Sequence, residues 1–275
     1  MDIGTIDLWA VSGRSSLHRA SALSKLLAAG LLVSAVIVTG DVFVLLAIYL
    51  VIAAGVVVAR LPLARVLTIA AYPALFALLF SISRWTGSLV EPLLITGKAM
   101  TAAAVMVLLI TTTPYPQLFA VLRRFLPALV SDALLITYRS LFILLELLND
   151  LLMSLRLRGG LTKRRYLHNA RNLAAGLGLL FVRALALSEQ LHDVLRLRGY
   201  SGRIAGGVSW RQTTRHDIFP LGASLLILTA VLFFRYAPGA RLYNGYFLLA
   251  AILSLLAALL VSHRRGAAGL GRVSR

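Results

Sequence analysis

The sequence predicts an all-α integral membrane protein with about six transmembrane helices and two long cytosolic or interfacial helices. Of its 275 residues, 59% are hydrophobic and only 14% are charged, whereas a soluble domain of this length needs far more charge to cover its surface. Six apolar stretches are long enough, or nearly so, to cross a bilayer, which takes about 20 helical residues. Between the fourth and fifth stretches lies a basic block with two long, mostly apolar segments.

The six predicted spans form a group of four followed by a group of two. A tight turn at Thr39-Gly40-Asp41 joins the first two spans into an antiparallel hairpin. The first span is short, and its Lys25 is expected to snorkel toward the membrane surface. Pro73 falls inside the third span, where neighbouring helices make a proline tolerable. The predicted spans are 22–39, 42–59, 66–83, 93–112, 217–234 and 243–262.

The basic residues predict the orientation of these spans. With a cytosolic N-terminus, 24 of the 28 Lys and Arg residues fall on the cytosolic side, as the positive-inside rule requires. We expect the N-terminus to be a retained cytosolic tail and both termini to be cytoplasmic. The net charge of +18 is then explained by topology and anionic lipid rather than by nucleic acid. The four basic residues on the outer side are Arg84, Lys98, Arg235 and Arg241.

The expected organisation has three parts. Residues 1–112 form the N-terminal transmembrane helices, residues 113–216 a cytosolic domain, and residues 217–275 the C-terminal transmembrane helices and a tail. The sequence has no cysteine, and its five histidines show no metal-ligand spacing. We read His216 with Asp217 as an interfacial anchor rather than a metal pair. No catalytic residue and no metal ligand are predicted.

The central block begins where prolines interrupt the helical pattern. Thr113-Pro114-Tyr115-Pro116 and Pro127 stop helices, and between them 117–126 reads as a short basic amphipathic helix for the membrane surface. One long helix is predicted from 128 to 158 and a second from about 170 to 198. Their basic connector is Lys163-Arg164-Arg165.

The first long helix carries few polar residues, and they are ordered. Asp132, Arg139 and Glu146 recur every seven residues on one face, and the rest of the surface is apolar. We expect this helix to be too charged to span alone and too apolar to lie free in the cytosol. It must therefore bury most of its circumference against another helix or the bilayer boundary.

Both long helices end in the same short sequence. Residues 154–159 read Ser-Leu-Arg-Leu-Arg-Gly and residues 194–199 read Val-Leu-Arg-Leu-Arg-Gly, an offset of 40 residues. A capping glycine and C-terminal arginines are ordinary features of a helix end. Two equivalent copies indicate a function, because guanidinium groups at exposed helix ends suit docking into a groove of carboxylates or carbonyls.

These features resemble the T component of energy-coupling factor (ECF) transporters. That family is a membrane scaffold with two long coupling helices, each ending in an Ala-Arg-Gly-like tripeptide that docks an ABC-type ATPase. The likeness runs from about Thr113 to Asp217, and its Arg-Gly-Tyr-Ser-Gly ending is most similar to the cobalt/nickel, CbiQ-like branch. Two departures are a leucine at the first position of both tripeptides and one additional C-terminal span. The strongest stretches are 138–142 leading to 157–159, and 180–183 leading to 197–202.

The resemblance implies a site and a set of partners. Two ATPase subunits would dock at the two tripeptides, and a separate substrate-binding (S) component, of the cobalt/nickel or vitamin type, would sit against the helices. No cofactor would be bound by this chain, and the partner ATPases would use ATP and Mg²⁺. The host membrane would be a bacterial or archaeal inner membrane. The implied docking residues are Leu157, Arg158, Gly159, Leu197, Arg198 and Gly199, supported by Arg156, Arg196, Arg139, Glu146 and Arg183.

Several other functions are less consistent with the sequence. A membrane-embedded enzyme needs converging ionisable groups, and the predicted spans contain almost none. A transporter that binds its own cargo usually has broken helices or polar groups at mid-membrane. A membrane-anchored nucleic-acid binder would need a solvated basic stripe, whereas the central arginines lie among apolar residues. A T component shared among vitamin-specific S components remains the nearest alternative.

Overall fold

Regular structure in the computed structural model is entirely helical over the residues that it describes, which confirms the all-α prediction. These residues are 10–11, 13, 15–83, 87–123, 125–160, 166–200, 217–236 and 244–270. The chain divides into two units, one of Met1–Leu118 with Ser209–Arg275 and one of Phe119–Val208. Several predicted features lie outside the described residues: Arg84, Arg124, the connector at 163–165, residues 201–202, His216, Arg241 and the tail after 270.

All six predicted spans are helices of the first unit. Three of them agree with the prediction to within two residues, α5 and α6 each begin three residues earlier, and α11 continues eight residues further. Thr39 and Asp41 cap the two sides of the predicted turn, and α5 runs through Pro73 as predicted. The helices are α2 (Ser16–Arg19), α3 (Ala22–Val38), α4 (Val42–Val58), α5 (Leu63–Ser83), α6 (Val90–Thr112), α10 (Ile218–Tyr236) and α11 (Asn244–Leu270).

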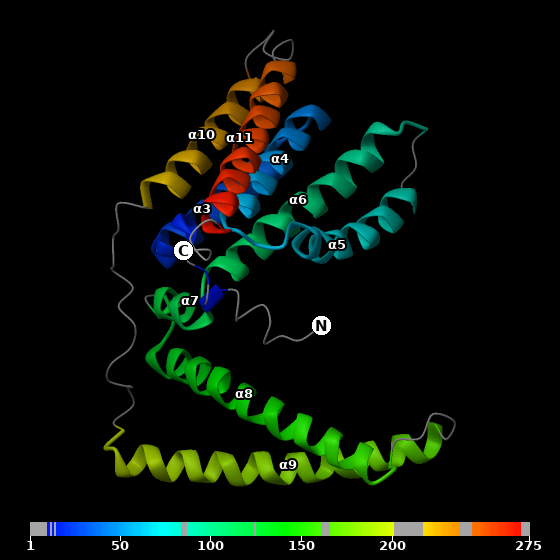
Figure 1. Ribbon diagram of the computed structural model, residues 1–275, viewed down its shortest axis with the longest axis vertical. Coiled ribbons are helices and arrows are strands. Elements are labelled where there is room, and N and C mark those ends of the chain that lie inside the picture. Colours follow the sequence, from blue (N-terminus) through cyan, green and yellow to red (C-terminus); the bar gives the residue numbers. More distant parts are fainter. Residues whose placement is uncertain are drawn as a thin grey trace. The chain divides into compact units, whose positions relative to one another are not determined.

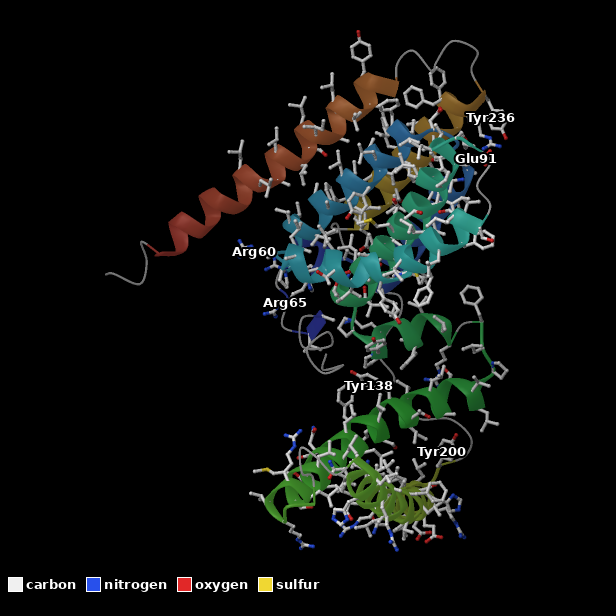
Figure 2. The ribbon with its side chains drawn as sticks, turned by 90° about the vertical axis from the view of Figure 1, so that its right-hand side faces the viewer. Arg60, Arg65, Glu91, Tyr138, Tyr200 and Tyr236 are labelled. Atoms are coloured by element: carbon white, nitrogen blue, oxygen red, sulfur yellow. The ribbon has the colours of Figure 1, made fainter. Side chains whose placement is uncertain are left out.

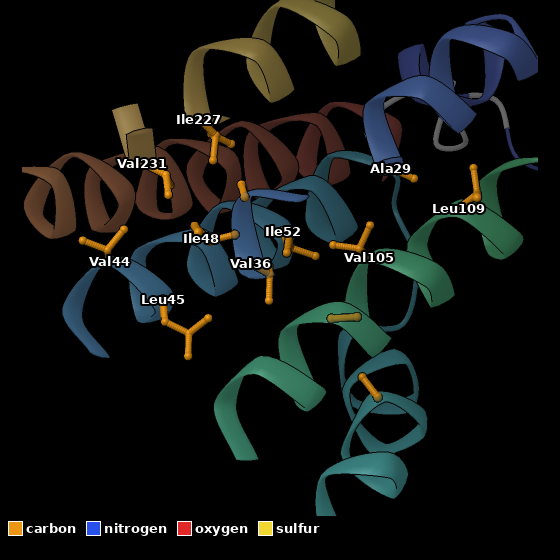
Figure 3. Packing of buried hydrophobic residues seen from close by; sticks show 13 residues of the cluster. Ala29, Val36, Val44, Leu45, Ile48, Ile52, Val105, Leu109, Ile227 and Val231 are labelled. Atoms are coloured by element: carbon orange, nitrogen blue, oxygen red, sulfur yellow. The ribbon is translucent and has the colours of Figure 1, made fainter. Parts of the chain in front are cut away.

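Helix α6 is the centre of the first unit. It packs against α3, α4 and α5, while α10 packs on α3 and α11 packs on α4 (Figure 1). The core between these helices is aliphatic, with Val36, Ile48 and Val105 almost fully buried (Figure 3). The core side chains are apolar, as expected of helices that bury their faces against each other and against lipid.

Two lysines show how the helices of the first unit alternate in direction. Lys25, near the start of α3, donates to the carbonyl oxygen of Thr112 at the end of α6, at 2.9 Å. Lys98, in the first half of α6, donates to the carbonyl oxygen of Ile37 at the end of α3, at 3.0 Å. Helices α3 and α6 are therefore antiparallel, as a chain that crosses a membrane back and forth requires.

The charged ends of the bundle follow the predicted sorting. Arg60, between α4 and α5, and Arg65, in the first turn of α5, lie at the opposite end of the first unit from Glu91 and Tyr236 (Figure 2). The first pair belongs to the end predicted to be cytosolic and the second pair to the end predicted to be outside. The membrane side that each end faces stays a prediction.

The expectation that Lys25 snorkels to the surface is wrong. Its side chain is 5% exposed, and its ammonium donates to the carbonyl oxygens of His18, at 3.2 Å, and Thr112. Two backbone acceptors inside the bundle compensate for the lost hydration, so the lysine does not need to reach water.

The two long helices form the second unit. Helix α8 (Ala128–Leu157) agrees with its predicted range, and α9 (Tyr166–Leu197) begins four residues earlier than predicted. They form an open hairpin, in contact near the end of α8 and the start of α9 and diverging toward their other ends (Figure 1). Gly176 of α9 faces α8, and an added Cβ there would lie 2.7 Å from Cδ2 of Leu151. The short helix α7 (Tyr115–Leu122) precedes α8 and begins two residues earlier than predicted, because Pro116 is compatible with a first helical turn.

Length and composition do not separate the long helices from the spans. Among the described residues, five helices are long and apolar enough to cross a membrane. By length and composition α8 could cross a membrane, so the prediction that it is too charged to span alone is wrong on that ground. Helices α3 and α4 and residues 245–260 of α11 are apolar but shorter. The five helices are α5, α6, α8, α9 and α10. In α9 the apolar stretch is Leu167–Leu197.

Candidate functional site

The first arginine tip closes α8 with a hydrogen-bonded glycine cap. Helix α8 ends at Leu157, and Gly159 takes a positive φ of 70°. The Gly159 N–H donates to the carbonyl oxygen of Arg156 at 3.1 Å, and the Gly160 N–H donates to that of Leu155 at 2.8 Å. This pair of bonds is the Schellman motif, which satisfies carbonyls that a helix end leaves unpaired. The predicted glycine cap of α8 is confirmed.

The second arginine tip closes α9 in the same way. Gly199 has a φ of 72°, and its N–H donates to the carbonyl oxygen of Arg196 at 3.0 Å. The Tyr200 N–H donates to that of Leu195, also at 3.0 Å. Because the two caps agree bond for bond, the sequence repeat is also a structural repeat.

Both tips present their side chains to the surroundings. We use "arginine tips" for residues 156–159 and 196–199. The leucines between the arginines are 79% exposed at Leu157 and 88% exposed at Leu197, and the four arginines are also exposed. Each tip therefore offers two guanidinium groups and one apolar side chain, fixed by a rigid cap, which is an arrangement that a partner surface can bind.

The tips lie at opposite ends of the hairpin. The side-chain amide of Asn172, near the start of α9, donates to the carbonyl oxygen of Gly160 at 2.9 Å. At the other end the Tyr200 hydroxyl donates to Oδ2 of Asp132, near the start of α8, at 3.2 Å. Helices α8 and α9 are thus antiparallel, and a helix of 30 residues separates the tips by about 45 Å.

Asp132 connects three segments of the second unit. Its side chain is 1% exposed, and its Oδ1 lies 3.7 Å from Nη2 of Arg123, one residue after α7. Partial burial, the negative charge of Asp132 and the hydrogen bond to it raise the pKa of the Tyr200 hydroxyl above its usual value. The sequence analysis grouped Asp132 with Arg139 and Glu146 on one helix face and did not predict this cluster.

Aromatic rings also hold the end of α7 against α8. The ring of Tyr138 lies edge-on to those of Phe119, at 6.1 Å, and Phe142, at 5.0 Å between centroids. Tyr138 and Phe142 bound one of the stretches that carry the family resemblance. In the structure Tyr138 therefore packs α8 against α7.

Of the five supporting residues predicted on the coupling helices, Arg156 and Arg196 lie in the tips and the other three do not. Arg139, Glu146 and Arg183 are exposed along the shafts of α8 and α9. At 1.5 Å per residue, Glu146 lies about 18 Å from Arg158 along α8. Asp132, predicted on the same face as Arg139 and Glu146, differs from them in being buried. Any role of these residues in docking stays a prediction.

The two long helices leave broad apolar faces uncovered within this chain. Only Ser131 and Asp132 of α8 are buried, and many large apolar side chains of both helices are exposed. Contiguous exposed apolar surface marks contact with a membrane or with another protein. The exposed side chains of this kind in the middle of α9 are Leu177, Leu179, Phe181, Val182 and Leu185.

Asp217 is a buried anchor in the first unit. Its Oδ1 accepts hydrogen bonds from the Ser21 N–H at 2.6 Å and from the Ser24 hydroxyl at 3.2 Å, and the residue is 6% exposed. It thereby ties the start of α10 to the start of α3. Within the described ranges, no three potential metal-binding side chains come together.

An all-α, multi-pass membrane protein with twin arginine tips is the class that this fold and site define. Residues 13–210, most of the chain, match the family model described as CbiQ, cobalt transport protein. The cobalt transport protein CbiQ of Salmonella typhimurium (strain LT2) is 35% identical over 106 residues, which cover 38% of this chain and 46% of the relative. The chain thus spans about half the length of this curated relative.

The chain belongs to the CbiQ family of cobalt transport proteins. The resemblance to the cobalt/nickel, CbiQ-like branch of ECF T components is therefore confirmed. Both arginine tips fall inside the matched range, as does the cluster around Asp132.

Proposed function

We propose that this protein is the transmembrane scaffold subunit of an ECF-type importer. It couples ATP hydrolysis by two partner ATPases to the movement of a separate substrate-binding component. The cargo is cobalt or nickel, a proposal supported by the family's description and by the name of the Salmonella relative. The complex lies in the cell membrane, with both termini of this chain on the cytoplasmic side.

The single observation that carries this proposal is the matched pair of arginine tips. Each tip ends a long helix, is fixed by the same hydrogen-bonded cap, and exposes its arginines. Guanidinium groups bind carboxylates and carbonyls in a fixed geometry, and two equivalent tips suit two copies of one kind of partner. Arg158 and Arg198 are the docking residues of this proposal.

The apolar faces of α8 and α9 support the second half of the proposal. A helix that transmits a displacement from its tip must contact the component that it moves. The exposed apolar side chains of α9 can contact both the bilayer boundary and an S component. The motor has to be a separate subunit, because the sequence contains no Gly-x-x-x-x-Gly-Lys-[Ser/Thr] motif for holding ATP phosphates.

Co-purification of the ATPase subunits tests this docking role. The chain is expressed with its ATPase and S component and isolated by an affinity tag as wild type, R158A, R198A and the double variant. We expect the double variant to insert normally and to retain less than about a tenth of the ATPase, since hydrogen bonds to charged groups contribute about 1.5–3 kcal/mol each. The matched control is R60A, which removes an exposed arginine between α4 and α5. ATPase recovery at the wild-type level with the double variant contradicts the proposal.

A further inference from the structure

The second arginine tip is bonded to the α7–α8 junction through one buried carboxylate. Asp132 accepts from the Tyr200 hydroxyl at 3.2 Å and lies 3.7 Å from the guanidinium of Arg123. Tyr200 directly follows the tip, Asp132 lies in the second turn of α8, and Arg123 follows α7. A single side chain therefore links three segments that are far apart in the sequence.

Tyr200 moves with the second tip because its backbone belongs to the cap. Its N–H is bonded to the carbonyl oxygen of Leu195 in the last turn of α9. Displacement of the Arg198 tip must therefore either carry the Tyr200 side chain along or break its bond to Asp132. Since Asp132 is almost fully buried, little water competes for its carboxylate, which strengthens both contacts.

The first tip differs at the residue that follows it. The position that corresponds to Tyr200 is Gly160, which has no side chain to reach another helix. Its carbonyl oxygen instead accepts a neutral hydrogen bond from Asn172, within the hairpin. Hydrogen bonds to ionised groups are about twice as strong as neutral ones, so the two tips differ both in the strength of their attachment and in the segment to which they are attached.

We propose that Arg123, Asp132 and Tyr200 form the mechanical link that passes displacement of the Arg198 tip to α7. Helix α7 follows the membrane helix α6 in the chain, so the link ends at the segment that continues from α6. The Arg158 tip, by contrast, anchors the hairpin. This inference rests on the proposed function. Tyr200, Asp132 and Arg123 act as positioning residues, because they act through the tip rather than touching cargo or ATP.

The test uses the whole complex, with both ATPase subunits and the S component, reconstituted into vesicles. The readouts are ATPase retention, the ATP hydrolysis rate and the amount of Co²⁺ taken up per ATP hydrolysed. For Y200F we expect normal ATPase retention, continued hydrolysis and about tenfold less Co²⁺ per ATP, in keeping with the loss of one hydrogen bond to a charged group. The matched control is Y236F, which removes the same hydroxyl from an exposed tyrosine of α10.

A second variant shows whether the contacts act in series. R123Q removes the ion pair between Arg123 and Asp132. It also serves as the test variant if Y200F folds poorly. In a serial link, Y200F/R123Q loses no more coupling than the worse single variant, about tenfold. Losses that multiply to about a hundredfold overturn the proposal, and so does wild-type Co²⁺ uptake per ATP in both single variants.

The outcomes separate this inference from the proposed function. If Y200F loses the ATPase, Tyr200 is a docking residue and the link is overturned while docking stands. If R158A/R198A keeps the ATPase, or if the wild-type complex takes up neither Co²⁺ nor Ni²⁺, the proposed function fails instead.

Discussion

Gly159 and Gly199 adopt the same left-handed backbone conformation, with φ values of 70° and 72°, at the same place in two helices. An alanine at either position would meet no neighbouring atom within 4 Å. Replacing either glycine therefore changes the backbone preference without introducing a clash. This makes the two glycines a clean test of whether the shape of each tip matters.

We expect G159A and G199A each to destabilise the capped tip by about 1 kcal/mol, because an L-residue in this conformation costs roughly 1–2 kcal/mol. Hydrogen exchange of the last helical turn measures the effect, and ATPase retention should fall in parallel. The control is G178A, an interior α9 position with open space around it, where alanine should stabilise the helix by about 0.5–1 kcal/mol. Equal exchange rates in G159A and G178A would contradict the prediction.

The pKa of Tyr200 should fall when Asp132 is neutralised. In the folded protein that pKa is raised by burial and by Asp132, so the contact contributes stability at pH values below the ordinary tyrosine pKa of about 10. That contribution is lost as the pH rises through the folded value. Tyrosinate absorbance of wild type minus that of Y200F isolates this group among the nine tyrosines. An unchanged titration midpoint in D132N would show that the carboxylate does not act on Tyr200.

Lys25 should stabilise the first unit through its two carbonyl contacts. We expect K25M to lower the free energy of unfolding by about 2 kcal/mol, because two buried carbonyl oxygens lose a charged donor. The matched control K98M removes a donor to one carbonyl at a more exposed site and should have a smaller effect. Thermal unfolding in detergent compares the two variants. A larger loss in K98M than in K25M is the contrary result.

The predicted orientation can be tested directly because the chain has no cysteine. In A64C the new thiol lies at an exposed position in the first turn of α5, and in S88C it lies just before α6. An impermeant thiol reagent added to intact cells should label S88C at once and A64C only after permeabilisation. Labelling in the opposite order would show that the topology is the inverse of the predicted one.

Much of the fold could be predicted because its signals are local. Long apolar runs mark the six spans of the first unit, and the turn at Thr39 and Asp41 follows from residue types alone. The glycine caps of α8 and α9 also follow from short sequence patterns. Each of these features depends on residues within one or two helical turns of each other.

The remaining features depend on contacts between distant residues. The burial of Lys25 depends on an acceptor on Thr112, which lies 87 residues away in the sequence. Tyr200 and Asp132, which form a hydrogen bond, are 68 residues apart. Periodicity in a single sequence carries no signal for such pairs. The extra turns of α11 were missed for a different reason, since the prediction ended that helix where its apolar stretch ended, near residue 262.

Site-directed cross-linking tests the docking role of the two tips most directly. Single cysteines replace Leu157 or Leu197, both highly exposed, and a short thiol-reactive photo-cross-linker is attached in the assembled complex. The control is L185C, an exposed position on α9 about 18 Å from Leu197 along the helix. We predict cross-links to the ATPase from both tips and none from position 185. ATPase cross-links from position 185 but from neither tip would contradict the account.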